Sequence, residues 1–182
     1  YEPLAAYLAL RMRRPVKITT SLDEGFFTAR RLAATIRMKT GFDRDGKIIV
    51  QDVTSDYLMG AYADAAPRIA QKAGFLACGP YRIPNLRNVV QALYSNTIPA
   101  TAMRGFGVTS VSFATETHLN RIADVLGMDA WELRLKNANR IGDTSGNGVA
   151  MQDPSTVAVT LAAAERVGIE LGAEYRQMTS DP

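Results

Sequence analysis

Two glycines and an arginine make one short loop the part of this sequence best suited to bind a ligand. The run Arg104-Gly105-Phe106-Gly107 stands directly before a long helical pattern. Glycine permits a tight turn and a close backbone approach, and a helix N-terminus presents unpaired N–H groups and the positive end of its dipole. Arg104 adds a charge that persists at neutral pH. We therefore expect an anion here, such as a phosphate, a carboxylate or a metal-oxo group, with the Phe106 ring covering a flat ligand.

The loop does not match the common nucleotide-binding motifs. The sequence contains no G-x-G-x-x-G run, and no Gly-Lys-Ser/Thr follows the glycines. From spacing alone, an alternative stays open, in which this is a structural glycine turn with a surface Arg104 and a core Phe106. The sequence around the loop is needed to choose between an anion-binding loop and a structural turn.

Histidine and cysteine are too scarce for most metal or thiol chemistry. The chain has one His, His118, and one Cys, Cys78. It can therefore form no disulfide within itself and no Cys/His zinc site from its own side chains. We expect His118 to be a core or interface residue of the long helix, and Cys78 to be a buried small apolar residue.

Composition and charge indicate an ordinary globular chain. Of the 182 residues, 47% are hydrophobic and 21% are charged, which excludes a disordered tail. The longest apolar stretches fall well short of the roughly 18 residues that a membrane span needs. The net charge is only +3, and the basic clusters at 11–14 and 30–31 carry no interleaved aromatic residues. We expect solvated helix ends there rather than a nucleic-acid partner.

The spacing of apolar residues, together with the turn and capping residues, predicts a domain of helices and strands. In it a strand, the glycine loop and the long helix follow one another. Helical patterns span 3–14, 21–30, 67–75, 109–126, 129–137 and 155–166. Strand patterns span 16–20, 33–42, 48–58 and 86–97. The turn at 43–47, with Gly46, predicts an antiparallel hairpin. The expected class is α+β, with antiparallel strands, helices packed beside them and a flexible loop at 143–153.

The order of several motifs resembles a known family. The chain is similar to the molybdenum-cofactor-binding (large) subunit of the xanthine dehydrogenase and aldehyde oxidase family of molybdenum hydroxylases, over nearly its whole length and most weakly after about residue 150. The motifs are Arg14-Pro15-Val16-Lys17, the hairpin 39–47, Gly79-Pro80-Tyr81-Arg82-Ile83-Pro84-Asn85, Tyr94-Ser95-Asn96-Thr97, Ala102-Met103-Arg104-Gly105-Phe106-Gly107 and 127–137.

The resemblance implies roles for particular residues. The segment Ala102, Met103, Arg104 and Gly105 matches the family loop that lies against the molybdenum centre. Phe106 matches the aromatic residue that packs on the substrate ring. Lys72 falls where purine-oxidising members carry an arginine that polarises the substrate, and it keeps the positive charge but loses the bidentate fork, which argues against purine specificity. The alternative for Lys72, that it is a solvated surface lysine, stays open.

The residues in and after the loop distinguish this chain from some members of the family. Typical members follow the loop with Gly-Pro-Gln, whereas this chain has Val108-Thr109-Ser110, and Ser110 is a shorter polar group at the position of the Gln. The loop lacks the cysteine of carbon monoxide dehydrogenases. The resemblance therefore favours a hydroxylase of aldehydes or N-heterocycles that uses oxygen from water.

No catalytic residue is expected within this chain. The family's general-base glutamate is expected outside it, and neither Glu2 nor Glu116 matches that base. We expect Glu116 to bond to neighbouring backbone. We interpret residues 1–182 as a single partial molybdopterin-binding domain, truncated at both ends. The isolated chain is expected to be inactive and to bind no cofactor stably.

The resemblance also implies the composition of the complete enzyme. Molybdopterin with molybdenum would be its cofactor, and [2Fe-2S] and FAD would lie in partner domains or subunits. The expected partners are the remainder of the molybdopterin subunit, these redox partners and a small-molecule substrate, in a cytoplasmic homo-oligomer. The alternative from another class is a non-catalytic α+β domain whose Arg104 loop binds an anion or a partner protein.

Overall fold

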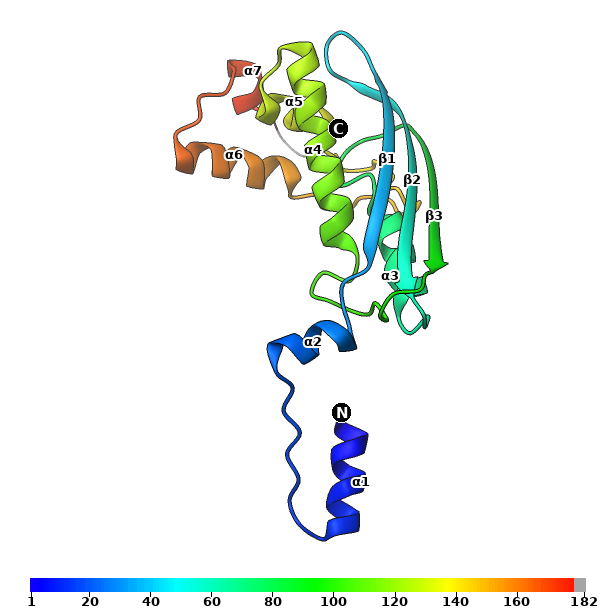
Figure 1. Cartoon of the computed structure of the whole chain (residues 1–182). Helices are drawn as coiled ribbons and strands as arrows, with labels where there is room; N and C mark the ends of the chain where they lie inside the picture. The colour runs from blue at the N-terminus through cyan, green and yellow to red at the C-terminus, as the bar shows by residue number, and fades with distance from the viewer. Residues whose placement is uncertain (179–182) are drawn as a thin grey trace.

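The computed structural model of the protein describes residues 1–178. Its helices and strands follow the predicted order closely (Figure 1). In chain order they are α1 (Glu2–Met12), α2 (Leu22–Thr28), β1 (Ala33–Phe42), β2 (Ile48–Gly60), α3 (Ala66–Phe75), β3 (Asn85–Tyr94), α4 (Val108–Leu126), α5 (Ala130–Asn137), α6 (Thr156–Val167) and α7 (Ala173–Arg176).

The sheet is mixed, with strand order β1-β2-β3. β1 and β2 form the predicted antiparallel hairpin, from the Ala33–Leu58 pair to the turn that Gly46 allows with a φ of 81°. β3 instead pairs parallel with β2, beginning opposite Val50. The α+β class is confirmed, but the expected antiparallel direction holds only for the hairpin. The segment 61–84 contains α3 and carries the chain back across the sheet, which is the kind of connection that parallel strands require.

Two other parts differ from the expected elements. The segment 16–20 is rich in β-branched residues, as strands often are, but it forms no strand, because no described segment pairs with its backbone. The short helix α7 was not predicted. The loop 143–153 is closed by two hydrogen bonds, from the Gly142 N–H to the Met151 carbonyl (2.9 Å) and from the Met151 N–H to the Asp143 carbonyl (2.7 Å). Its flexibility stays a prediction.

The core divides into three packed clusters, of which the first two include residues of the long helix α4. The first lies between the sheet, α3 and the start of α4, and it includes Val53, Tyr57, Ile69, Ala73 and Val111. The second joins the later part of α4 to α5 and includes Ile48, Tyr81, Leu119 and Leu133. The third joins α5 to α6 and α7 and includes Leu135, Val157, Ala164 and Tyr175. The start of α4 is therefore held firmly against α3 and the sheet.

The helices α1 and α2 form an arm that stands clear of this body (Figure 1). Neither helix buries any residue, and large apolar side chains such as Leu10 and Phe27 are exposed. Local signals explain the helices: α1 has Pro3 in its first turn, and α2 begins with the predicted capping box of Ser21 and Glu24. Among the described residues, no helix is long and apolar enough to cross a membrane.

Candidate functional site

The loop leads directly into α4, as predicted, and its residues 102–105 lie at the surface. Ala102 to Gly105 are exposed, Phe106 is half-buried and Gly107, the N-cap of α4, is buried. Gly105, Phe106 and Gly107 all have positive φ, at 98°, 51° and 92°. A Cβ on Gly107 would stand 2.5 Å from the Ile69 carbonyl oxygen, so the close approach to α3 requires glycine.

The exposed part of the loop offers a row of free N–H donors. Inside the loop the Phe106 N–H donates to the Met103 carbonyl (2.8 Å), and the Val108 N–H donates to the Gly105 carbonyl (3.1 Å). The main-chain N–H groups of residues 102–105 donate to no acceptor in the part of the chain that the structure describes. Exposed N–H groups beside a helix N-terminus and an arginine are suited to an anionic ligand.

The two residues predicted to contact substrate lie together beside this loop. The Lys72 ammonium, on α3, is 5.8 Å from the centroid of the Phe106 ring, within the range of a cation–π interaction. Lys72 is exposed and forms no ion pair with a described residue. Phe106 packs in part against the first core cluster. The arrangement presents an aromatic surface and a positive charge at one place on the rim.

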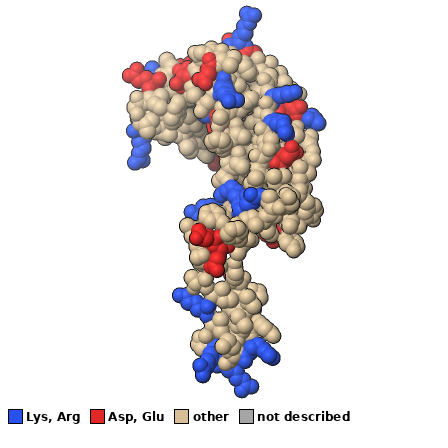
Figure 2. All heavy atoms as spheres, in the orientation of Figure 1, with Lys and Arg blue, Asp and Glu red and all other residues tan. Residues whose placement is uncertain are grey.

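The second basic cluster contacts the loop instead of forming the solvated helix end that was predicted. Arg30 donates to the Thr97 hydroxyl (2.7 Å). Arg31 donates from one NH₂ group to the Arg104 carbonyl (3.1 Å) and from the other to the Thr109 hydroxyl. Figure 2 shows basic side chains gathered where the arm meets the body. The prediction failed here because the contacts join segments that are far apart in the sequence.

Ser110 is turned into the protein. Its hydroxyl donates to the Gly107 carbonyl (2.9 Å) and lies 3.2 Å from the Tyr57 hydroxyl. Burial raises the pKa of the Tyr57 phenol, and the hydrogen bond to Ser110 opposes that rise in part. Through these two contacts the Ser110 side chain links the first turn of α4 to the Gly107 carbonyl and to Tyr57 on β2.

Glu116 belongs to a side-chain network, so the expectation that it bonds to neighbouring backbone was wrong. The Tyr81 hydroxyl donates to both of its carboxylate oxygens (2.9 and 3.0 Å), and Arg134 Nε donates to one of them (2.8 Å). Burial, and then the Glu116 charge, raise the pKa of Tyr81 far above its usual value. Glu116 lies more than two turns into α4, and Glu2 is exposed on α1, so neither stands at the loop.

His118 and Cys78 have the structural positions that were predicted. His118 is half-buried, and its Nε2 atom is 3.0 Å from the Thr40 hydroxyl, which links α4 to β1. Burial, and secondly the charge of Arg121, lower the pKa of this histidine. Cys78 is buried as a free thiol, and burial raises its pKa. The described residues contain no group of three or more His, Cys, Asp or Glu side chains that could hold a metal ion.

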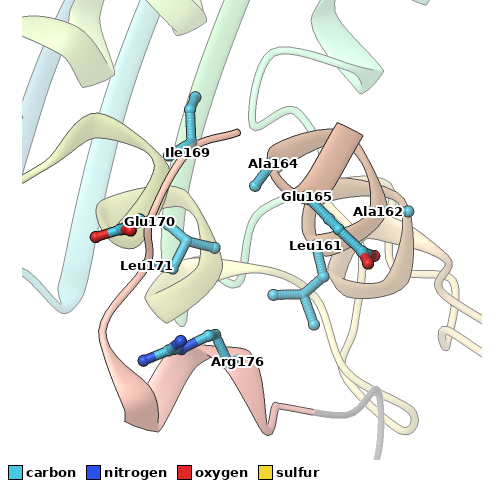
Figure 3. Close-up of a pocket in the computed structure, with 8 residues that line it drawn as sticks. All are labelled: Leu161, Ala162, Ala164, Glu165, Ile169, Glu170, Leu171 and Arg176. Carbon is cyan, nitrogen blue, oxygen red and sulfur yellow. The ribbon is translucent and has the colours of Figure 1, made fainter. Parts of the chain in front are cut away.

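A hollow that contains none of the predicted site residues lies between α6 and α7. Its volume is about 460 Å³, and Figure 3 shows apolar side chains with two glutamates and an arginine around it. The lining residues are Leu161, Ala162, Ala164, Glu165, Ile169, Glu170, Leu171 and Arg176. This hollow is therefore separate from the loop before α4 and from Lys72.

Comparison with known proteins decides the family. A family model described as the molybdopterin cofactor-binding domain matches residues 1–138. This chain belongs to that family. The match includes the loop, α3 and the whole of α4, whereas the hollow between α6 and α7 lies outside it.

Similar curated proteins are much longer than this chain. It is 40% identical over 143 residues to a probable xanthine dehydrogenase subunit of Bacillus subtilis (strain 168), covering 78% of this chain and 19% of that protein. It is 31% identical over 167 residues to the nicotinate dehydrogenase large molybdopterin subunit of Eubacterium barkeri, covering 91% of this chain and 39% of that protein. The chain therefore spans less than half the length of these relatives.

Solved structures share the fold. The aldehyde oxidoreductase from Desulfovibrio gigas matches with a TM-score of 0.67 and 27% identity, over 79% of this chain and 16% of that one. The aldehyde oxidoreductase from Desulfovibrio desulfuricans has a TM-score of 0.78 at 24% identity, over 95% of this chain and 20% of that one, which is a likeness of fold.

Proposed function

We propose that this chain forms part of the molybdopterin site of a molybdenum hydroxylase that acts on aldehydes or N-heterocycles. One observation carries the proposal. The N–H groups of four consecutive exposed residues, from Ala102 to Gly105, have no acceptor among the described residues and lie just before the start of α4. This donor row falls within the match to the molybdopterin cofactor-binding domain family.

The residues of the loop fit an anionic cofactor. The N–H groups of residues 102–105 would donate to its oxygen or sulfur atoms, and Arg104 would balance its negative charge. Glycine at position 105 allows the loop its positive φ and its close packing against the Thr109 side chain. When bound, molybdopterin with its metal supplies the two-electron redox chemistry by which a substrate carbon gains an oxygen atom from water.

Two residues beside the loop would orient the substrate. Phe106 offers a flat apolar surface against which an aromatic or unsaturated ring packs. Lys72 holds a positive charge next to that surface and would attract an electronegative atom of the substrate. The general base would come from a part of the complete protein outside this chain, so we assign no catalytic residue among residues 1–182.

The complete enzyme would need further parts. We propose that the remainder of a molybdopterin subunit, together with [2Fe-2S] and FAD partners, completes it in a cytoplasmic homo-oligomer. The similar proteins, which are at least twice as long as this chain, support the presence of a remainder of the molybdopterin subunit. The exposed apolar side chains of α1 and α2 support it as well, since contiguous apolar surface of this kind marks an interaction site.

The source of the oxygen atom tests the reaction class. The complete polypeptide, with its redox partners, is incubated with aldehydes and N-heterocycles in H₂¹⁸O, and products are examined by mass spectrometry. We expect a hydroxylated or carboxylate product that carries ¹⁸O. The absence of oxidation across both substrate classes, or product oxygen derived from O₂, would contradict the proposal.

The isolated 182-residue chain provides a second test. We expect metal analysis of the purified chain to find far less than stoichiometric molybdenum, because a pterin is normally held by several domains. Near-stoichiometric molybdenum would show that this expectation is wrong. The alternative of a non-catalytic anion- or partner-binding domain is not favoured by the family match.

A further inference from the structure

The main chain brings Arg31 to the side of the glycine loop. The neighbouring Arg30 forms two backbone hydrogen bonds with the segment that leads into the loop. Its N–H donates to the Pro99 carbonyl (3.2 Å), and its carbonyl accepts from the Thr101 N–H (3.0 Å). The Cα atom of Arg31 is therefore fixed next to the point where the loop begins, and its side chain extends along the loop from there.

The guanidinium of Arg31 spans the loop. One NH₂ group donates to the Arg104 carbonyl at 3.1 Å, and the other donates to the Thr109 hydroxyl. Arg104 directly precedes the three residues with positive φ, and Thr109 lies in the first turn of α4 just after them. A planar fork with fixed donors can hold two such points at once, which a lysine ammonium on a flexible stem does poorly.

The loop has few other restraints on its shape. Phe106 is not a glycine, yet its φ is 51°, a conformation that L-residues adopt only at a cost. Two backbone hydrogen bonds act within the loop, from Phe106 to Met103 and from Val108 to Gly105. The Thr109 side chain also covers the loop, because a Cβ added to Gly105 would stand 2.7 Å from Thr109 Cγ2.

We propose that Arg31 is a positioning residue for this site. By holding the Arg104 carbonyl against the first turn of α4, it fixes the conformation of the loop backbone from residue 102 to 105 and the place of the Phe106 ring. Arg31 acts through the loop backbone and is not itself a ligand of the cofactor. What the loop binds rests on the proposed function, whereas the restraint on its shape does not.

Hydrogen–deuterium exchange of the complete polypeptide, without added cofactor, tests the restraint. In Arg31→Lys and in Thr109→Val we expect the Phe106 and Val108 amides to exchange at least about tenfold faster, while the thermal unfolding midpoint stays unchanged, since exposed side chains contribute little to global stability. Thr109→Ser keeps the hydroxyl acceptor and should exchange as the wild type does. The double variant Arg31→Lys/Thr109→Val should exchange no faster than either single variant.

Arg37→Lys is the matched control, because Arg37 is an exposed arginine on β1 that pairs with Asp56, away from the loop. It should leave exchange at 102–108 unchanged. Unchanged exchange in Arg31→Lys and Arg31→Ala would overturn the proposal, and so would an increase spread over the whole chain. The measurement needs no metal, so a failure of the tether and a failure of the proposed cofactor are seen separately.

Discussion

The residues whose side chains could contact a ligand lie together at the loop before α4. The Lys72 ammonium lies over the Phe106 ring, although the two residues belong to different elements. The resemblance to the family assigns each residue to the substrate site, but the sequence does not show that they contact each other. The folded structure shows that contact. At this place the protein therefore offers an aromatic surface for a flat substrate and a positive charge that favours an electronegative atom of the substrate.

Lys72 provides a kinetic prediction at this scale. In the complete enzyme we expect Lys72→Ala to lower kcat/KM about two- to fivefold, as the loss of a solvent-exposed charged contact to the substrate worth about 0.5–1 kcal/mol would imply. Lys72→Arg should retain most of the activity. Gln71→Ala, an exposed neighbour on α3, serves as the control. Wild-type kinetics in Lys72→Ala would remove Lys72 from the substrate site.

His118 predicts how stability depends on pH. Burial and Arg121 hold its pKa below the usual value, so the unfolded chain binds a proton more readily than the folded one. Its contribution to stability is therefore present above about pH 6.5 and is lost as the pH falls towards the folded pKa. Urea unfolding at about pH 7.5 and about pH 5.5 should show a smaller loss of stability in His118→Gln than in the wild type. An equal loss in both would contradict the assignment.

Between elements, Asn137 fixes the end of α5 to the hairpin turn. It is buried, its amide donates to the Gly46 carbonyl (2.8 Å), and its carbonyl oxygen accepts from the Ile48 N–H (2.8 Å). Sequence patterns gave no sign of this role, since Asn137 is simply the last residue of a helical pattern. The contact explains why the hairpin and α5 pack as one unit.

Loss of these bonds should be costly. We expect Asn137→Ala to lower the free energy of unfolding by about 2–4 kcal/mol, because it leaves the Gly46 carbonyl and the Ile48 N–H buried without partners. Equilibrium denaturation measures this. As the control, Asn147→Ala alters an exposed asparagine in the loop 143–153 and should cost far less. Equal stability of the two variants would show that the Asn137 bonds do not tie α5 to the hairpin.

The two glycines that flank α4 allow a matched comparison. Both have positive φ, at 92° for Gly107 and 64° for Gly127, but only Gly107 is crowded by backbone. Gly127→Ala should cost about 1 kcal/mol from the left-handed conformation alone. Gly107→Ala should cost about 2–5 kcal/mol, because its Cβ would also collide with the Ile69 carbonyl. Thermal unfolding of the two variants distinguishes the causes, and equal costs would contradict the close packing of the loop on α3.

Elements defined by local signals were predictable, and those that depend on distant partners were not. The hairpin follows from alternation and the turn at Gly46, and α4 ends at Gly127 as its sequence indicates. The direction of β3 depends on where α3 returns the chain, and residues 16–20 lack a strand to pair with. Likewise the residues of the loop were found from sequence, whereas Arg31 was not, because its contacts form only when α2 and α4 are assembled.

At the scale of the whole molecule, the exposed arm and the scarcity of His and Cys are both consistent with one part of a larger cofactor-binding protein. A metal carried by an organic cofactor needs no His or Cys ligand from this chain, and a site at the rim beside an uncovered arm is suited to completion by further protein. The central claim is that the loop 102–105 holds this cofactor.

The molybdenum-to-protein ratio of the complete polypeptide tests that claim most directly. Metal analysis is applied to the wild type, to Arg104→Glu and to Arg44→Glu, the last being an exposed arginine in the hairpin turn. We predict near-stoichiometric molybdenum in the wild type and in Arg44→Glu, and a loss of about tenfold or more in Arg104→Glu, since a charge-assisted contact becomes a repulsion. Wild-type molybdenum content in Arg104→Glu would contradict the assignment of the site.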